Sequence, residues 1–510
     1  MDKRVGVNYK LLERRNINDY LNSLRNKSLT AKETQQALQQ LSTMGPEVIW
    51  VSLERLKMAS EQETEFLAFV LEVLADEQTV GKVIEYLLDL LRSSNVSADK
   101  KGILLNILQN LGISLEDLPD DILNFDLDEV ALGSIEQMLE DVNKRPEIAA
   151  LILRELDKFD EDMLKDFMQG LIATKHNSAA FILQFLILSG RPSLVDLSLK
   201  FLVEMNTPYC YKVLHDLLNG NKANPVKIIR AINKIKVPKK VQNLKPQNLN
   251  FGRPDKIYGS NIDGSGNRIL WFVWSIPQRK TLFRSVNFLI NCEEGIKDCW
   301  GSVRMSQKEI SNLKTDFEKE SVLRILSEDY ALKLLKDALF RSRQQKKFIP
   351  LESVFWLSLL PTEARRAEKM NFFPAETISY IGGDKEELIT LIDEKAFEDW
   401  YITNDDVMDL AKALLSAGKK SRRTNQLKEV AVRFSREILQ PLLQDYYRRL
   451  LYQADFFVNS DYPEDKELSR KILYLLKNYP KEKPEENPFF NRLIFESLTS
   501  ATALILTENE

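Results

Sequence analysis

The feature that most constrains this chain is a helical pattern that repeats along residues 31–219. Blocks of apolar residues at helical spacing alternate there with short polar breaks. We interpret pairs of these blocks as helical hairpins, which begin every 30 to 35 residues at Ala31, Gln62, Ser97, Leu127, Asp160 and Pro192. Such a period is typical of helical-repeat proteins, in which stacked hairpins bury one another's apolar faces.

Residues that favour helix starts stand where this pattern needs them. The second helix of three hairpins follows a proline, at Pro46, Pro146 and Pro208. Proline is tolerated in a first helical turn because its missing N–H would have no partner there. Asp160 stands at the start of a first helix, where its carboxylate can cap the free amides. The block FLAFVLEVL at 66–74 is apolar nearly all round, so we expect neighbours on more than one side.

The period and the pairing of helices resemble those of HEAT-like α-solenoids over about residues 31–235. The spacing is shorter than that of a typical HEAT unit. HEAT-like proteins are scaffolds and adaptors, so the resemblance implies a protein that binds partners on an extended surface. An irregular all-helical domain is the alternative architecture for this region.

The chain changes character after the repeat. Residues 1–30 are expected to be a helical lead-in and residues 31–236 the solenoid of about six hairpins. Residues 237–255 are polar, basic and rich in proline and asparagine, which is typical of a linker. We therefore place the main domain boundary in this segment.

Residues 256–304 have the pattern of strands and turns. The runs KIYGS, RILWFVWSI, KTLFRSVNFLIN and IKDCWGSVRM predict a small antiparallel β-meander, with the second run as a central strand covered on both faces. Such a meander must pack on helices to be stable. Residues 305–510 are again helical, with Pro441 as a kink or break in a long helix. The predicted fold is mainly α, and the meander and these helices are expected to form one α+β domain.

Two basic clusters are candidate sites for an anionic partner. Residues 217–254 hold nine basic residues and no acidic one, and a helix starting at Asn224 would place several of them on one face. The second cluster lies at 419–449, where three arginines fall within about 60° of one another on a helix. The candidate residues are Lys227, Arg230, Lys234, Lys239 and Lys240, with Arg422, Arg433 and Arg436. Because phosphates bind accessible cations, these clusters support binding of nucleic acid or another phosphate ligand as an alternative function.

An acidic stretch is the counterpart of the basic clusters. Residues 114–143 hold ten acidic residues and no basic one. Candidate residues for a basic partner are Asp117, Asp120, Asp121, Asp126, Asp128 and Glu129. Charge segregation of this size within one chain favours a charged partner or an intramolecular contact.

The composition argues against catalysis. The chain has two histidines, His176 and His215, which nearly removes the commonest general base and metal ligand. We expect no catalytic residue, and a carboxylate-dependent enzyme is the more remote alternative. Three cysteines cannot form a disulfide framework, and they are expected to be free thiols in a reducing compartment rather than zinc ligands.

One loop has the spacing of half a calcium site. Residues 261–266, NIDGSG, place oxygen-bearing side chains at the first, third and fifth positions of an EF-hand-like loop, but Phe272 stands where the twelfth-position glutamate is needed. Strands flank the loop, so a hairpin connection with glycines at positive φ is the favoured interpretation over a cation site. We therefore expect no metal and no cofactor.

The sequence shows no apolar stretch of the roughly 20 residues that a membrane span requires, and its N-terminus is charged. We therefore expect a cytoplasmic protein without a membrane partner. The function that these features favour is a non-enzymatic scaffold or adaptor that binds other proteins on its solenoid surface.

Overall fold

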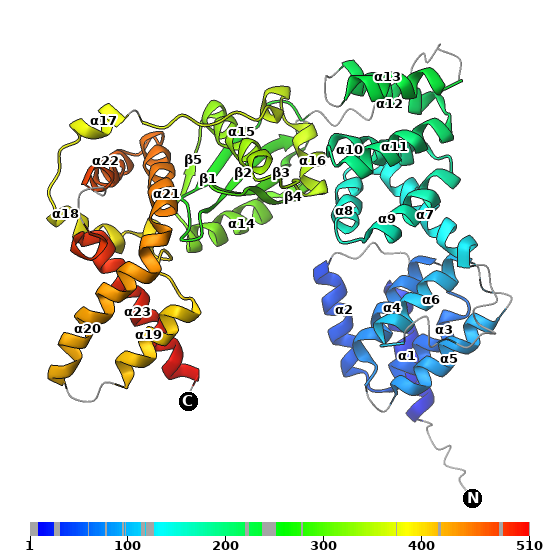
Figure 1. The fold of residues 1–510 in the computed structure, drawn as a ribbon. Helices are drawn as coiled ribbons and strands as arrows, with labels where there is room; N and C mark the ends of the chain where they lie inside the picture. The colour runs from blue at the N-terminus through cyan, green and yellow to red at the C-terminus, as the bar shows by residue number, and fades with distance from the viewer. Residues whose placement is uncertain are drawn as a thin grey trace, which may run out of the picture. The chain divides into compact units, whose positions relative to one another are not determined.

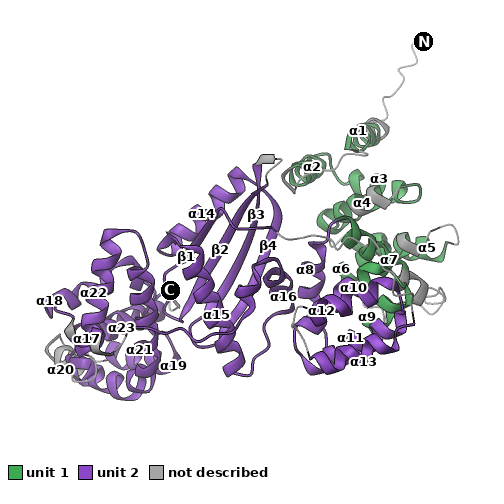
Figure 2. Ribbon diagram, turned by 90° about the horizontal axis from the view of Figure 1, so that it is seen from above, with its two compact units in different colours: residues 1–144, 165–179 green, residues 145–164, 180–510 purple. Residues whose placement is uncertain are grey.

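The computed structural model describes residues 9–24, 31–59, 61–76, 79–93, 96, 98–113, 118, 127–219, 224–236, 251–276, 279–373, 375–416, 420–478 and 483–508. The chain forms two compact units (Figure 2). Unit 1 comprises residues 1–144 and 165–179, and unit 2 comprises residues 145–164 and 180–510. The predicted linker at 237–255 lies within the range of unit 2, and its first fourteen residues are outside the described part.

The first half of the chain is a series of helical hairpins, as the repeat predicts. Its helices are α1 (Tyr9–Leu24), α2 (Ala31–Thr43), α3 (Glu47–Leu56), α4 (Glu61–Leu74), α5 (Val80–Arg92), α6 (Ala98–Asn110), α7 (Leu127–Lys144), α8 (Ile148–Leu156), α9 (Glu161–Ala173), α10 (Asn177–Leu188), α11 (Pro192–Met205), α12 (Pro208–Asn219) and α13 (Pro225–Lys234). The six predicted hairpin starts fall within one residue of the starts of α2, α4, α6, α7, α9 and α11. The predicted capping residue Asp160 accepts a hydrogen bond from the Met163 amide at 2.8 Å.

The core of unit 1 consists of aliphatic side chains. Helix α4 buries Leu67, Val70 and Leu71 completely in this core. Its other side leaves Phe69 and Val73 exposed by 41% and 51%. The expectation that the whole block 66–74 would be covered is therefore met on one side of the helix only.

The strands of unit 2 form one antiparallel sheet. They are β1 (Lys256–Ser260), β2 (Asn267–Ile276), β3 (Arg279–Asn291), β4 (Gly295–Ser306) and β5 (Leu323–Ile325), in the order β4-β3-β2-β1-β5. The four predicted strands are confirmed. Strand β5 was not predicted, because three residues between two helices are too short to show a period of two. It pairs with β1, where Tyr258 lies opposite Ile325.

Helices cover both faces of the sheet (Figure 1). On one face, α14 (Gln307–Glu320) packs Ile310 against Trp271 and Val273 of β2. On the other face, α15 (Glu328–Gln344) and α16 (Leu351–Leu359) pack on β4, and the Trp356 ring lies over Gly301. The prediction of a central strand covered on both faces is confirmed, since β2 buries residues 270–274 without interruption.

The C-terminal helices complete unit 2. They are α17 (Ala375–Tyr380), α18 (Glu386–Ile389), α19 (Asp405–Leu415), α20 (Lys420–Phe434), α21 (Gln440–Val458), α22 (Pro463–Asn478) and α23 (Pro488–Glu508). A π-helical turn, Ser435–Leu439, joins α20 to α21, and Pro441 lies in the first turn of α21. The predicted kink or break at this proline therefore corresponds to a change from α-helical to π-helical hydrogen bonding just before it, and the chain stays helical. Proline lacks the N–H that would continue the regular ladder of hydrogen bonds.

Within the described residues, one helix is long and apolar enough to cross a bilayer by length and composition, namely residues 488–507 of α23. This helix packs against α19 and buries Phe489, Leu493 and Ala501 completely. In all, 39% of this window is buried within the structure. The expectation that no stretch has the length and composition of a membrane span is therefore wrong for this helix.

Candidate functional site

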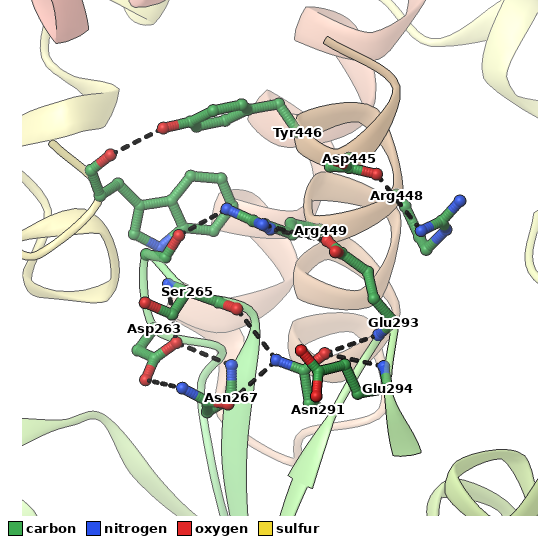
Figure 3. Close-up of polar contacts among 12 residues, drawn as sticks. Asp263, Ser265, Asn267, Asn291, Glu293, Glu294, Asp445, Tyr446, Arg448 and Arg449 are labelled. Atoms are coloured by element: carbon green, nitrogen blue, oxygen red, sulfur yellow. Dashed lines mark hydrogen bonds and ion pairs between the residues drawn. The ribbon is translucent and has the colours of Figure 1, made fainter. Parts of the chain in front are cut away.

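The most elaborate polar site joins two turns of the sheet to α21 (Figure 3). The Asp263 carboxylate accepts hydrogen bonds from the amides of Ser265 at 2.9 Å and Asn267 at 2.7 Å. It also accepts a bond from the Asn267 side-chain amide at 2.9 Å. These bonds close the β1–β2 connection into a tight turn.

This geometry decides between the two interpretations of residues 261–266. Both oxygens of Asp263 accept N–H groups of the turn, which leaves the carboxylate committed to the hairpin connection. Gly266 has the expected positive φ of 82°. Gly264 is required for a different reason, because a Cβ there would lie 2.0 Å from the carbonyl oxygen of Asp399. The segment is therefore a hairpin turn packed against a neighbouring loop.

Asn291 ties this turn to the β3–β4 turn. Its side-chain nitrogen donates to the Ser265 carbonyl oxygen and to Oδ1 of Asn267, both at 2.9 Å. Its Oδ1 accepts the amides of Glu293 at 2.8 Å and Glu294 at 3.0 Å. Asn291 is 5% exposed, so these four bonds satisfy a buried polar side chain.

Arg449 of α21 clamps both turns. Its Nη1 donates to the Gly264 carbonyl oxygen at 2.6 Å, and its Nε donates to Oε1 of Glu293 at 3.1 Å. One turn further towards the N-terminus of α21, the Tyr446 hydroxyl donates to the Trp400 carbonyl oxygen at 3.0 Å. The neighbouring Arg448 contacts Asp445 at 3.4 Å and takes no part in the clamp.

Two titratable groups near the clamp, Cys292 and Asp399, have raised pKa values. Burial, and then the charge of Glu293, raise the pKa of the Cys292 thiol to about 12. A thiol with such a pKa is protonated at neutral pH and is a poor nucleophile. Burial and then the nearby Asp263 charge also raise the pKa of Asp399. The arrangement can position two turns against a helix, and it contains no nucleophile paired with a base.

A cluster of buried charged side chains lies between the sheet and the helices α15 and α21, and the sequence did not predict it. Arg268 of β2 is 3% exposed, stacks on the Phe456 ring at 4.5 Å and donates to the Tyr452 carbonyl oxygen at 3.3 Å. Nearby, Tyr330 donates to Asp455 at 2.7 Å. Because burial dominates, the pKa of Arg268 is lowered and that of Asp455 is raised. The signal in the sequence was an arginine at the start of an almost wholly apolar strand.

The first basic cluster is partly neutralised. On α13, Lys227 forms an ion pair with Asp196 at 2.6 Å, whereas Arg230 and Lys234 are exposed. The predicted start of this helix is confirmed, since Asn224 accepts the amides of Val226 and Lys227. Lys239 and Lys240 lie outside the described residues.

The second basic cluster is paired with one acidic neighbour. Arg433 contacts Glu437 at 2.7 Å and Arg436 contacts it at 2.8 Å. Arg422 lies on α20, but its side chain is outside the described part of the structure. Fewer free cations therefore remain at this site than the sequence alone indicates.

The candidate residues for a basic partner lie almost wholly outside the part of the chain that the structure describes. Asp117, Asp120, Asp121 and Asp126 lie outside the described residues. Asp128 and Glu129 lie in the first turn of α7, and their side chains are not described. The proposed role of this stretch therefore stays a prediction.

Metal binding has no geometric support in the described ranges, where no group of three or more His, Cys, Asp or Glu side chains could hold an ion. His176 contacts Glu140 at 3.2 Å, and His215 contacts Asn219 at 3.2 Å. Comparisons with protein-family models, with curated proteins and with solved structures found no match.

Proposed function

We propose that the protein is a non-enzymatic scaffold or adaptor that binds other proteins on the surface of its helical repeat. The resemblance to HEAT-like α-solenoids supports this function by analogy of architecture. We also propose a cytoplasmic location, since its three cysteines, Cys210, Cys292 and Cys299, are free and buried.

The observation that carries this proposal is the exposure of apolar side chains one helical turn apart. Phe69 and Val73 are exposed on α4. On α13, Val226 and Ile229 are exposed by 55% and 45%. Residues at i, i+3 and i+4 share a helix face, so each pair forms a small apolar surface. Grouped apolar residues on a surface are typical of protein-binding sites.

Affinity purification of the intact protein from its own cytoplasm tests this function. The extract is divided into nuclease-treated and untreated halves, and bound proteins are identified by mass spectrometry. We expect a defined partner that survives nuclease and whose recovery falls at least tenfold in Phe69→Ser/Val73→Ser or in Val226→Ser/Ile229→Ser. The control is Val432→Ser, which changes an exposed apolar residue of α20 outside the repeat. Undiminished recovery with both double variants would overturn the proposal.

Binding of nucleic acid or another phosphate ligand is the second candidate. It is favoured by Arg230 and Lys234, which are exposed one turn apart and make no ion pair within the described part of the chain. The ion pairs of Lys227, Arg433 and Arg436 weigh against it. Co-purified nucleic acid that is lost at raised salt and in Arg230→Ala/Lys234→Ala would establish this function instead.

A further inference from the structure

A preformed groove lies beside the edge strand of the sheet in unit 2. Strand β4 is last in the sheet order and pairs with β3 alone. Next to its final residues is a cavity of about 700 Å³, within the usual range for binding sites. Helix α8 forms one wall through Ile148 and Leu151, and the Trp356 ring lines the cavity as well.

The elements around the groove are fixed by ion pairs and close packing. Arg154 of α8 contacts Glu352 of α16 at 2.5 Å, and Glu352 also accepts the Trp356 indole N–H at 2.9 Å. A Cβ on Gly301 would lie 2.7 Å from the Trp356 ring, so glycine allows the ring to pack directly on the strand. A partner therefore meets a shaped surface without first having to order it.

The edge of β4 beside the groove is not suited to pairing with another strand. Phe283 pairs with Met305 and Ser285 pairs with Ser302, so two residues of β4 oppose Arg284 alone. Such a bulge protects an edge strand from further pairing. The Arg304 amide at this bulge donates to the Ser302 hydroxyl at 3.3 Å. An occupant must therefore bind through side chains rather than extend the sheet.

The charges of the groove define its occupant. Arg145 and Arg304 line it, are exposed and make no ion pair within the described residues. Glu147 is the single carboxylate of the lining, so two guanidinium groups face one negative charge. Leu151 in the wall is 56% exposed, which is a high value for a large apolar side chain in a helix that packs on α16.

We propose that this groove binds an acidic segment of a partner protein. An apolar side chain of that segment contacts Ile148 and Leu151 of α8, and its flanking carboxylates pair with Arg145 and Arg304. Arginine suits this role because its planar fork of donors matches a carboxylate. The proposal rests on the proposed protein-binding function and adds the chemical class of the segment that is bound.

Fluorescence anisotropy on the full chain tests the groove with a defined probe. The probe is a fluorescent peptide with a Leu-Phe-Leu centre flanked by glutamates, and the matched probe carries lysines in their place. We expect the acidic peptide to bind at least tenfold more tightly than the basic one. Arg145→Glu/Arg304→Glu should reverse this preference, and Leu151→Asp should weaken binding at least tenfold. The control is Arg343→Glu, an exposed arginine of α15 that does not line the groove.

Equal binding of both peptides, or binding that ignores the double arginine variant, would overturn the proposal. Sedimentation of the full chain adds a further arm: a dimer that Leu151→Asp dissociates would make a second copy the occupant and would also overturn it. The repeat variants Phe69→Ser/Val73→Ser should leave peptide binding unchanged. A result that overturns peptide binding in the groove is thus distinguishable from one that overturns partner binding on the repeat.

Discussion

The helical core of unit 1 and the core beneath the sheet of unit 2 are built differently. The first consists almost entirely of aliphatic side chains, such as Leu67, Leu71 and Leu87, all fully buried. The second contains Arg268, Asp337 and Asp455 at 5% exposure or less. Apolar burial is non-directional and scales with area. Buried charges stabilise a fold only when each one keeps its partners.

The comparison implies different responses to mutation. Loss of one aliphatic side chain leaves a cavity but no unpaired group. Loss of one member of a charged cluster leaves its partners buried without hydrogen bonds. The core beneath the sheet should therefore be the more sensitive of the two to single substitutions.

Asp337→Ala should have the largest effect. Asp337 is 1% exposed, accepts the Met370 amide at 2.7 Å and is also bonded to the Tyr452 hydroxyl and Arg341. We expect a loss of about 3–5 kcal/mol in the free energy of unfolding, since the substitution breaks a buried charged cluster. Urea unfolding followed by tryptophan fluorescence measures this loss, because every tryptophan except Trp50 lies at 271–400.

The control for this variant is Asp337→Asn. It retains an acceptor for the Met370 amide and should therefore lose clearly less stability than the alanine variant. Losses below about 1 kcal/mol for both variants, less than the cost of one buried unpaired group, would contradict the view that this core depends on its charges.

Leu67→Ala should have the next largest effect. The change removes a fully buried side chain from α4 and should cost about 3 kcal/mol through lost burial and a residual cavity. Hydrogen exchange followed by mass spectrometry should show faster exchange in peptides of α3, α4 and α5. The exchange rates of peptides from the sheet should not change. Acceleration of equal size in β2 and β3 would contradict the separation of the two cores.

Arg449→Ala should have a smaller effect than either. It removes the bonds to the Gly264 carbonyl oxygen and to Glu293 and should cost about 1–3 kcal/mol, as for other partly buried hydrogen bonds to charged groups. The matched control is Arg448→Ala, whose contact with Asp445 is more exposed and should be worth about 0.5 kcal/mol or less. Equal losses in urea unfolding would show that the clamp adds nothing to the stability of unit 2.

The same contrast explains what the sequence could predict. The hairpin starts followed from apolar periodicity, which an aliphatic core needs along the whole repeat. The charged cluster could not be predicted, because charged residues such as Asp337 and Asp455 on amphipathic helices ordinarily face solvent. Their burial depends on which helices pack on the sheet. For the same reason the sequence placed Lys227 on a free basic face, although Asp196 of another helix pairs with it.

The pH dependence of stability gives the smallest expected effect and tests the buried charges directly. Burial raises the pKa of Asp455 above its ordinary value of 3.8. The folded protein then holds a proton that the unfolded chain has lost, so this carboxyl group's contribution is fully present below pH 3.8. It is lost as the pH rises through the raised pKa.

Asp455→Asn removes this titration while keeping an oxygen to accept the Tyr330 hydroxyl. Urea unfolding is measured from pH 3.8 upwards through the raised pKa of Asp455. The free energy of unfolding of the variant, minus that of the unmodified protein, should rise with pH and then become constant. Glu437→Gln is the opposite control, since Arg436 and Arg433 lower the pKa of Glu437. Its relative stability should fall as the pH rises towards 4.5. The same direction of change in both variants would contradict the assignment of Asp455 as a carboxyl group whose pKa is raised by burial.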